Sequence, residues 1–213
     1  FRGATMVTMA TVAAGSVSTL KLPWVDELKN SYDGDAATLT SVLAKGGAYH
    51  VKSDQPVTVY QFNPLEFTIP DPGGCAQGGF PGCNSYTNDA SLLLPANALG
   101  TSYIAASSPA LAASSLGTVN SIPGLLSITA TQDGTKVTVK SSANVRAGSG
   151  VTAMKAGDTQ TFTMNQGDVV QLLTAVPGQG DLSSCKSAGL GGPTVCVVAK
   201  TFDLTSTTVD SDK

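Results

Sequence analysis

Apolar and polar positions alternate along much of the chain, which predicts β-structure. In residues 125–140, LLSITATQDGTKVTVK, the alternation continues on both sides of Asp133-Gly134. Asp-Gly between two alternating runs is the strongest short-range signal for a hairpin. Residues 160–174, QTFTMNQGDVVQLLT, repeat this pattern around a turn at 165–168. Both segments are therefore predicted to form antiparallel hairpins.

The first half of the chain carries weaker signals of the same kind. Residues 4–22 read as two strands around an Ala13–Ser16 turn, and Pro23 ends the second one. Residues 49–66 hold two short β-type runs separated by the turn residues 53–56, SDQP. Alternation after that turn predicts a strand with one buried face. The apolar run at 92–94 is interpreted as a buried strand that Pro95 ends.

Two segments, 70–88 and 176–194, are dense in glycine and interpreted as long loops. Four cysteines lie in or beside these segments, and four cysteines allow three pairings. We expect the sequential pairing, which joins Cys75 to Cys83 and Cys185 to Cys196. Each bridge would stabilise the fold by roughly 2.5–3 kcal/mol and would indicate an oxidising compartment. The alternative is four free, buried thiols in a cytosolic protein.

Composition narrows the class of protein. The 213 residues are 41% hydrophobic, so a core can form, but only 13% are charged. The net charge of −3 provides no basic patch, which argues against nucleic-acid binding. No run of about 18 apolar residues is present, so no transmembrane segment is predicted. Because the chain begins at Phe1 and shows no signal peptide, we expect a processed or trimmed segment.

The sequence offers little catalytic chemistry, and no catalytic residue is predicted. His50 is the only histidine, and no Gly-x-Ser-x-Gly motif accompanies it. Carboxylates such as Asp54 and Asp168 are explained most simply by their turns. No metal site and no cofactor are expected, because the cysteines lack CxxC spacing and Asp33-Gly34-Asp35 is not a complete calcium loop.

Exposed aromatic side chains are the candidates for ligand contact, since sugars and proteins stack on them. Phe80 lies in the first glycine-rich loop, where a phenylalanine is hard to bury. Tyr86 and Trp24 are the other predicted ligand-binding residues, and Tyr32 is a further aromatic candidate.

Two pairs of segments resemble each other. Residues 13–22, AAGSVSTLKL, match 165–174, NQGDVVQLLT, and residues 49–55 match 207–213. This suggests repeat-like units at about 4–66 and 125–213, joined by 67–124, within one β-rich region spanning 1–213. Repeated β-units of this size pack as a sandwich or as propeller blades.

Several blocks resemble a known family. AYHVKSDQPVTVYQFNPLE, TNDASLLLPANALGTSYI, ITATQDGTKVTV, NQGDVVQLLT and DLTSTTVDSDK are similar, in this order, to the IgG Fc-binding protein N-terminal domain family. The resemblance extends over about 13–213 and implies an extracellular, β-rich module without catalytic residues. In that family the final turn leads into a further strand, so this chain is expected to be a fragment of a longer domain. The strand that would accept the missing one is then left with an edge that another chain can pair.

These features predict an all-β protein of antiparallel sheets with little or no helix. The predicted function is a non-catalytic module, extracellular or at the cell surface, that binds a protein or a glycan. The alternatives are a structural subunit of an extracellular assembly, with edge strands pairing between chains, or a secreted hydrolase. Binding of Fc itself has no residue motif in this chain.

Overall fold

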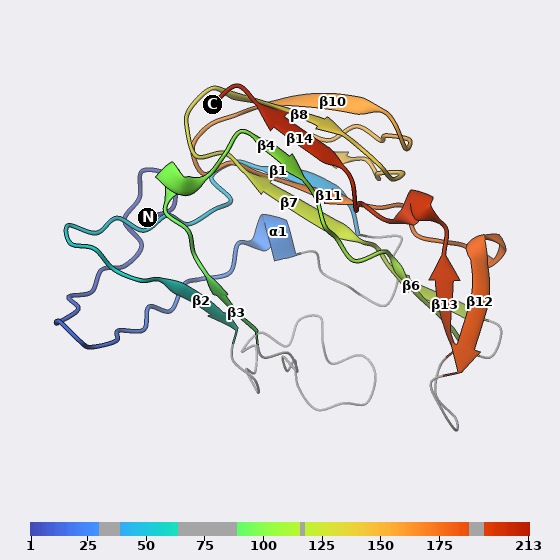
Figure 1. Ribbon diagram of the computed structural model, residues 1–213, viewed down its shortest axis with the longest axis horizontal. Coiled ribbons are helices and arrows are strands. Elements are labelled where there is room, and N and C mark those ends of the chain that lie inside the picture. Colours follow the sequence, from blue (N-terminus) through green and yellow to red (C-terminus); the bar gives the residue numbers. More distant parts are fainter. Residues whose placement is uncertain (30–38, 64–88, 116–117, 188–193) are drawn as a thin grey trace.

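The structure is a computed structural model that describes residues 1–29, 39–63, 89–115, 118–187 and 194–213 (Figure 1). Within these ranges the chain forms fourteen strands, one short α-helix and three 3-10 turns. The predicted all-β class with little helix is therefore confirmed. Every pair of neighbouring strands is antiparallel except β1 and β9, which run parallel, in the described part of the chain.

The strands form three four-stranded sheets and one two-stranded ribbon. In spatial order, sheet I contains β7 (Leu125–Thr129), β11 (Val169–Leu173), β1 (Ser41–Ala44) and β9 (Gly148–Ser149), and sheet II contains β10 (Thr159–Met164), β8 (Thr135–Lys140), β14 (Thr208–Ser211) and β4 (Ser102–Ile104). Sheet III contains β12 (Leu182–Ser187), β13 (Thr194–Val198), β5 (Leu111–Ser115) and β6 (Thr118–Ile122), and the ribbon contains β2 (Tyr60–Asn63) and β3 (Asp89–Leu92). The helical pieces are α1 (Asp26–Lys29), η2 (Ala96–Ala98), η3 (Gln179–Asp181) and η4 (Lys200–Phe202).

Sheets I and II pack face to face as a sandwich, with sheet II as the upper layer in Figure 1. Their inner faces supply one continuous core, in which alternate residues of each strand point inward. The strand residues of this core are Val137, Val139, Phe162, Met164, Val170, Leu172 and Val209, with Leu126 and Ile128 packed against it. Of the two predicted packings, the central sheets therefore adopt the sandwich.

The two predicted hairpins are wrong in their pairing, although their strands and turns are placed correctly. β7 and β8 lie in opposite sheets, and so do β10 and β11. Each segment is thus an arch whose two strands face each other across the core. The arches stack, so that β7 pairs with β11 in sheet I and β8 pairs with β10 in sheet II. An arch and a hairpin bury the same alternate residues, and the apolar pattern does not distinguish them.

β1 completes sheet I from an earlier part of the chain. It pairs with β11 along one edge and with β9 along the other. Ser41 is fully buried, and its Oγ accepts a hydrogen bond of 3.0 Å from the Leu173 N–H. A Cβ atom on Gly148 would lie 1.6 Å from the Ser41 carbonyl oxygen, so β9 approaches β1 closely only because position 148 is glycine.

The predicted strands within 4–22 are absent. Residues 6–13 and 16–24 have no strand assignment, although the turn between them is present, with Ser16 N–H donating to Ala13 O at 3.0 Å. An extended segment becomes a strand only when a neighbouring segment pairs with its backbone. In 49–66, the described strand is Tyr60–Asn63 alone. The apolar run at 92–94 is exposed, not buried.

The segments matched in the sequence repeat have different structures. Residues 17–22 are exposed and unassigned, whereas Val169–Leu173 form β11 and are buried at all five positions. The division into repeat-like units therefore stays a prediction from sequence.

Candidate binding surfaces

Sheet III has one buried face and one exposed apolar face. Ala112, Cys196 and Ser121 lie in register with one another across three strands, and all three are buried. Side chains next to them along each strand point the other way. Leu111, Ile122, Val195 and Val197 occupy this opposite face and are 42–56% exposed. We call these four residues the sheet III apolar face.

A disulfide between Cys185 and Cys196 joins β12 to β13 behind this face. It is one of the two bridges expected from the sequence. The register of the two strands shifts between Ser183 and Lys186, and Ser184 has a φ of +48°. The bridge therefore spans a bulge and ties β12 to β13 where the ladder of hydrogen bonds is interrupted.

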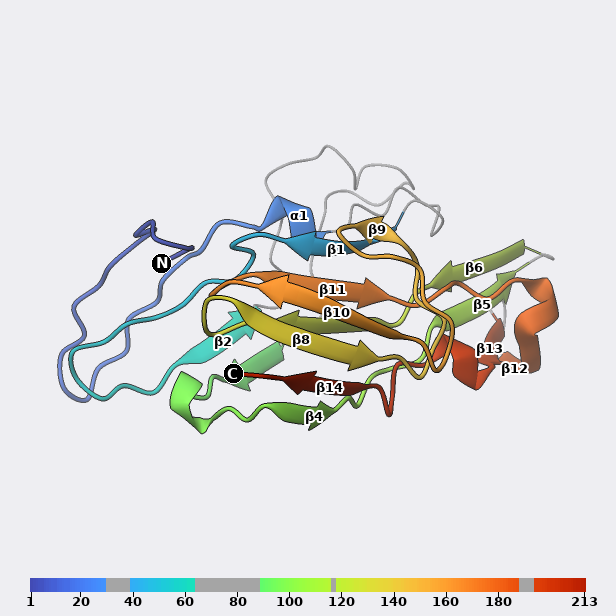
Figure 2. The same cartoon turned by 90° about the horizontal axis from the view of Figure 1, so that it is seen from above.

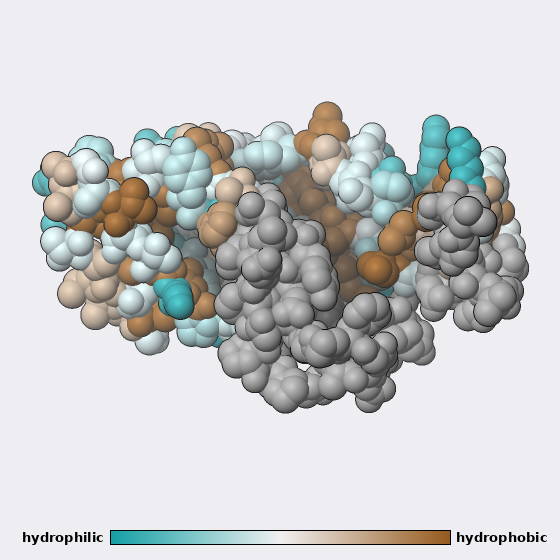
Figure 3. Space-filling model, turned by 90° about the horizontal axis from the view of Figure 1, so that it is seen from below, coloured by the Kyte–Doolittle hydropathy of each residue, from teal (hydrophilic) through white to brown (hydrophobic). Residues whose placement is uncertain are grey.

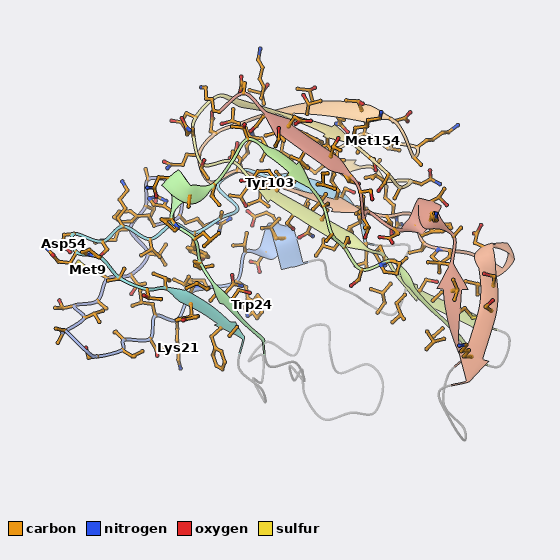
Figure 4. The ribbon with its side chains drawn as sticks, in the orientation of Figure 1. Met9, Lys21, Trp24, Asp54, Tyr103 and Met154 are labelled. Atoms are coloured by element: carbon orange, nitrogen blue, oxygen red, sulfur yellow. A yellow bond between two sulfur atoms is a disulfide. The ribbon has the colours of Figure 1, made fainter. Side chains whose placement is uncertain are left out.

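Of the predicted ligand-binding residues, the structure describes only Trp24. Trp24 lies just before α1 and is 54% exposed (Figure 4). Phe80, Tyr86 and Tyr32 lie outside the described residues, as do Cys75 and Cys83. Trp24 is thus the one predicted contact residue that can be placed, and it is accessible to a ligand.

The β2–β3 ribbon presents aromatic residues that the sequence analysis did not select. Tyr60 lies opposite Leu92, and Phe62 lies opposite Ala90, all on one face. Gln61 and Ser91 face the other way. The sequence predicts a strand with one buried face after the turn at 53–56, but the side chains of Tyr60 and Phe62 are 64% and 60% exposed. We call Tyr60, Phe62, Ala90 and Leu92 the ribbon apolar face.

His50 has no described neighbour of the kind a catalytic triad requires. Its ring stacks on Phe1 with centroids 5.3 Å apart, and its Nε2 is buried without a hydrogen-bond partner in the described structure. Burial lowers the pKa of His50, and the positive charges of the Phe1 amino group and Lys52 lower it further. The imidazole of His50 therefore serves as a packing surface for Phe1 at the start of the chain.

Asp168 organises the turn of the β10–β11 arch. Its carboxylate accepts hydrogen bonds of 2.8 Å from the backbone N–H groups of Asn165 and Gly46, and it forms an ion pair of 2.8 Å with Lys45. Burial alone would raise the pKa of Asp168, but these three partners outweigh it and hold the pKa below its ordinary value. The role expected from its turn position fits this geometry.

The arch turns are also tied to each other. Gln166 N–H donates to Asp133 Oδ1 at 3.0 Å, and Gly134 N–H donates to Asn165 Oδ1 at 3.0 Å.

Within the described ranges, no three His, Cys, Asp or Glu side chains lie close enough together to hold a metal ion. No helix in those ranges is long and apolar enough to cross a membrane.

A disulfide-linked, multi-sheet, largely antiparallel fold defines the class as a β-sandwich protein. A family model described as IgGFc binding protein matches residues 89–213, which extend from β3 through β14. The chain belongs to this family, as the sequence resemblance indicated. No curated protein and no solved structure matches the chain significantly.

Proposed function

We propose that this chain is a non-catalytic extracellular or cell-surface module that binds another protein through the sheet III apolar face. Membership of the IgGFc binding family supports the proposal, because all four strands of sheet III lie inside the matched residues. The disulfide supports an oxidising, extracellular location.

The chemistry of the sheet III apolar face fits a protein partner. Its four side chains are aliphatic, carry no charge and are about half exposed. When a partner covers a fixed apolar patch of this kind, the free energy of the complex falls by about 25 cal/mol per Å² of apolar area removed from water. Because the disulfide restrains β12 and β13, little ordering is required on binding.

The experiment is a binding assay with the immobilised chain against extracellular proteins, with IgG Fc as the first probe. We expect Val195→Ser/Val197→Ser to weaken binding of whichever protein the native chain captures by at least about tenfold. Ile104→Ser, in the edge strand β4 and 75% exposed, is the matched control and should bind as the native chain does. Equal binding by all three chains would rule out this face.

Glycan binding is the second candidate, and exposed Trp24 is the observation that favours it. A glycan array probed with the native chain and with Trp24→Ala separates the two ligands. Selective capture of a glycan, lost in Trp24→Ala, would replace the protein-binding proposal.

A secreted hydrolase is disfavoured by the surroundings of His50. Its side chain has no hydrogen bond to a serine or aspartate in the described structure. Hydrolysis of glycoside or ester substrates that disappears in His50→Ala would contradict the non-catalytic assignment.

A further inference from the structure

Exposed apolar side chains concentrate at one end of the molecule, away from sheet III. Fifteen of the 22 large apolar side chains exposed in the described structure lie in residues 6–24, 51–62 and 92–99. They are Met6, Met9, Val12, Val17, Leu20, Leu22, Trp24, Val51, Val57, Tyr60, Phe62, Leu92, Leu93, Leu94 and Leu99. Figure 3 shows brown, apolar patches among pale, more polar ones at this end, on the left, and Figure 4 places Met9 and Asp54 at its tip.

The ribbon gives this surface a regular centre. In β2 and β3 apolar and polar residues alternate, which is the pattern of a strand with one covered face. Here the face that holds Tyr60, Phe62 and Leu92 is open, with each of the three side chains more than half exposed. An isolated two-stranded ribbon is at best marginally stable in water, so it normally packs against another layer.

Charge favours an identical partner. Residues 57–63 and 90–100 contain no Asp, Glu, Lys, Arg or His. Two copies of the ribbon apolar face can therefore meet without like charges facing each other, which is the usual obstacle to self-association. A partner with a charged face would gain no counter-charge from the ribbon apolar face.

The exposed area sets the expected strength of the contact. The three aromatic side chains, at 54–64% exposure, offer about 100–150 Å² each. The twelve aliphatic side chains add on the order of 50 Å² each. All fifteen side chains together expose about 900 Å², but the ribbon apolar face alone exposes only about 300–400 Å², below the roughly 800 Å² that each partner buries in a standard interface, so the dimer is expected to be weak.

We propose that two copies of this chain associate through this end of the molecule, with the ribbon apolar faces packed against each other about a two-fold axis. The ribbons then form a small two-layer sandwich, in which Tyr60 and Phe62 of each copy are covered. Gln61 and Ser91 remain on the outer, solvated faces. Sheet III lies at the opposite end (Figure 2) and stays free to bind a different protein.

The test is sedimentation velocity on the full chain from roughly 1 to 200 µM, without any ligand. The native chain is expected to shift from monomer to dimer over this range. Ala90→Glu places a charge on the ribbon apolar face and should weaken dimerisation by at least about tenfold. Ser91→Glu places the same charge on the next residue, on the opposite face of the ribbon, and should dimerise as the native chain does.

Tyr60→Ser/Phe62→Ser is a second disrupting variant, and unfolding curves show whether each variant retains the fold. The proposal is overturned if the native chain stays monomeric throughout, or if Ala90→Glu and Tyr60→Ser/Phe62→Ser both dimerise like the native chain. It is also overturned if the chain is monomeric and binds neutral phosphatidylcholine vesicles through the same residues. Because no ligand is present, none of these results depends on the protein-binding proposal.

Discussion

At the scale of single residues, Asp168 is a buried polar group that connects two elements of the sandwich. It is almost fully buried, yet its charge is matched by Lys45 and by two backbone N–H groups. Hydrogen bonds to a charged acceptor contribute about 1.5–3 kcal/mol each, roughly twice as much as neutral ones. The same three partners connect the arch turn to the segment after β1, so that one side chain fixes two elements.

Replacing Asp168 with asparagine is expected to destabilise the fold by about 2–4 kcal/mol at neutral pH. An amide oxygen can accept only part of this set of bonds, and the amide NH₂ would face a backbone donor. Urea unfolding monitored by fluorescence or circular dichroism measures the change. Asp54→Asn, at an exposed turn, is the control and should change the free energy of unfolding by no more than about 0.5 kcal/mol.

The depressed pKa of Asp168 also predicts a pH dependence. A carboxyl whose pKa is lower in the folded than in the unfolded state adds stability above its unfolded value, near 3.9, and loses it as the pH falls through the folded value. The difference in unfolding free energy between the native chain and Asp168→Asn should therefore be constant from pH 5 to 7 and shrink below about pH 4. A difference that is unchanged at pH 3 would show that Asp168 is not the group responsible.

Gly148→Ala is expected to destabilise the protein by at least about 2 kcal/mol. The added Cβ would lie 1.6 Å from a backbone oxygen of Ser41, so β9 must move away from β1. Gly180→Ala is the matched control, since no atom lies within 4 Å of its added Cβ. Thermal unfolding of both variants measures the contrast. Equal midpoints would mean that the parallel β1–β9 contact adds no stability.

At the scale of elements, the disulfide and the bulge in sheet III belong together. The bridge joins residues 11 apart in sequence, across the one register shift found between paired strands in the described chain. A bulge leaves one residue unpaired and weakens the local ladder. The covalent link holds β12 in register where its hydrogen bonds cannot.

Cys185→Ser/Cys196→Ser should therefore lower the stability of sheet III by about 2–3 kcal/mol. Hydrogen exchange should become faster in β12 and β13 and change little in β8 and β10, because the core of the sandwich does not include this sheet. The control is Ser183→Ala, which changes a residue of β12 but leaves the disulfide intact. Uniformly faster exchange in all sheets would show that sheet III and the sandwich unfold as one unit.

Particular elements show how far sequence reasoning extends. The alternation at Leu126 and Ile128, and at Val137 and Val139, correctly placed β7 and β8 and their inward faces. It did not give their partners, because each strand pairs with a segment at least 19 residues away in the sequence. Residues 4–22 have the composition of strands, but strand formation needs a paired backbone that composition does not reveal.

The same limit applies to the binding surfaces: the sequence indicates individual residues but not which strands pair or which faces are covered. Trp24 could be selected because it is one of few aromatic residues in the chain and aromatic rings stack on ligands, and it is exposed. Tyr60 and Phe62 were missed because alternation predicts which residues share a face but not whether that face is covered. The sheet III apolar face was missed because its register joins β13 to a segment about 80 residues earlier.

At the scale of the whole molecule, the family match and the sandwich do not have the same limits. The matched residues begin at 89, whereas β1, which occupies an inner position of sheet I, comes from Ser41–Ala44. Residues 1–24 contribute mainly exposed surface and are attached through hydrogen bonds of Phe1, Arg2 and Pro23. We therefore expect β1 to matter more for the stability of the fold than residues 1–24.

Removing residues 1–24 should change the free energy of unfolding by no more than about 1 kcal/mol, whereas removing 1–88 should strip β1 from sheet I. Without β1, the edge of β11 is exposed, and the Leu173 N–H loses the Ser41 Oγ to which it donates a hydrogen bond. We expect it to aggregate, or to unfold at a midpoint lower by about 10 °C or more. Light scattering and calorimetry measure both effects. A stable, soluble 89–213 chain would show that β1 is dispensable.

The position of β14 has a consequence for how the protein is made. β14 comes after every other described strand in the sequence, yet it lies between β8 and β4 inside sheet II. During synthesis β4 emerges about 100 residues before its partner, with its backbone unpaired and Ile104 in water. Sheet II therefore cannot close until β14 has been synthesised, and its folding rate is limited by long loop closure. Until β14 arrives, the nascent protein presents open strand edges that a chaperone can shield from aggregation.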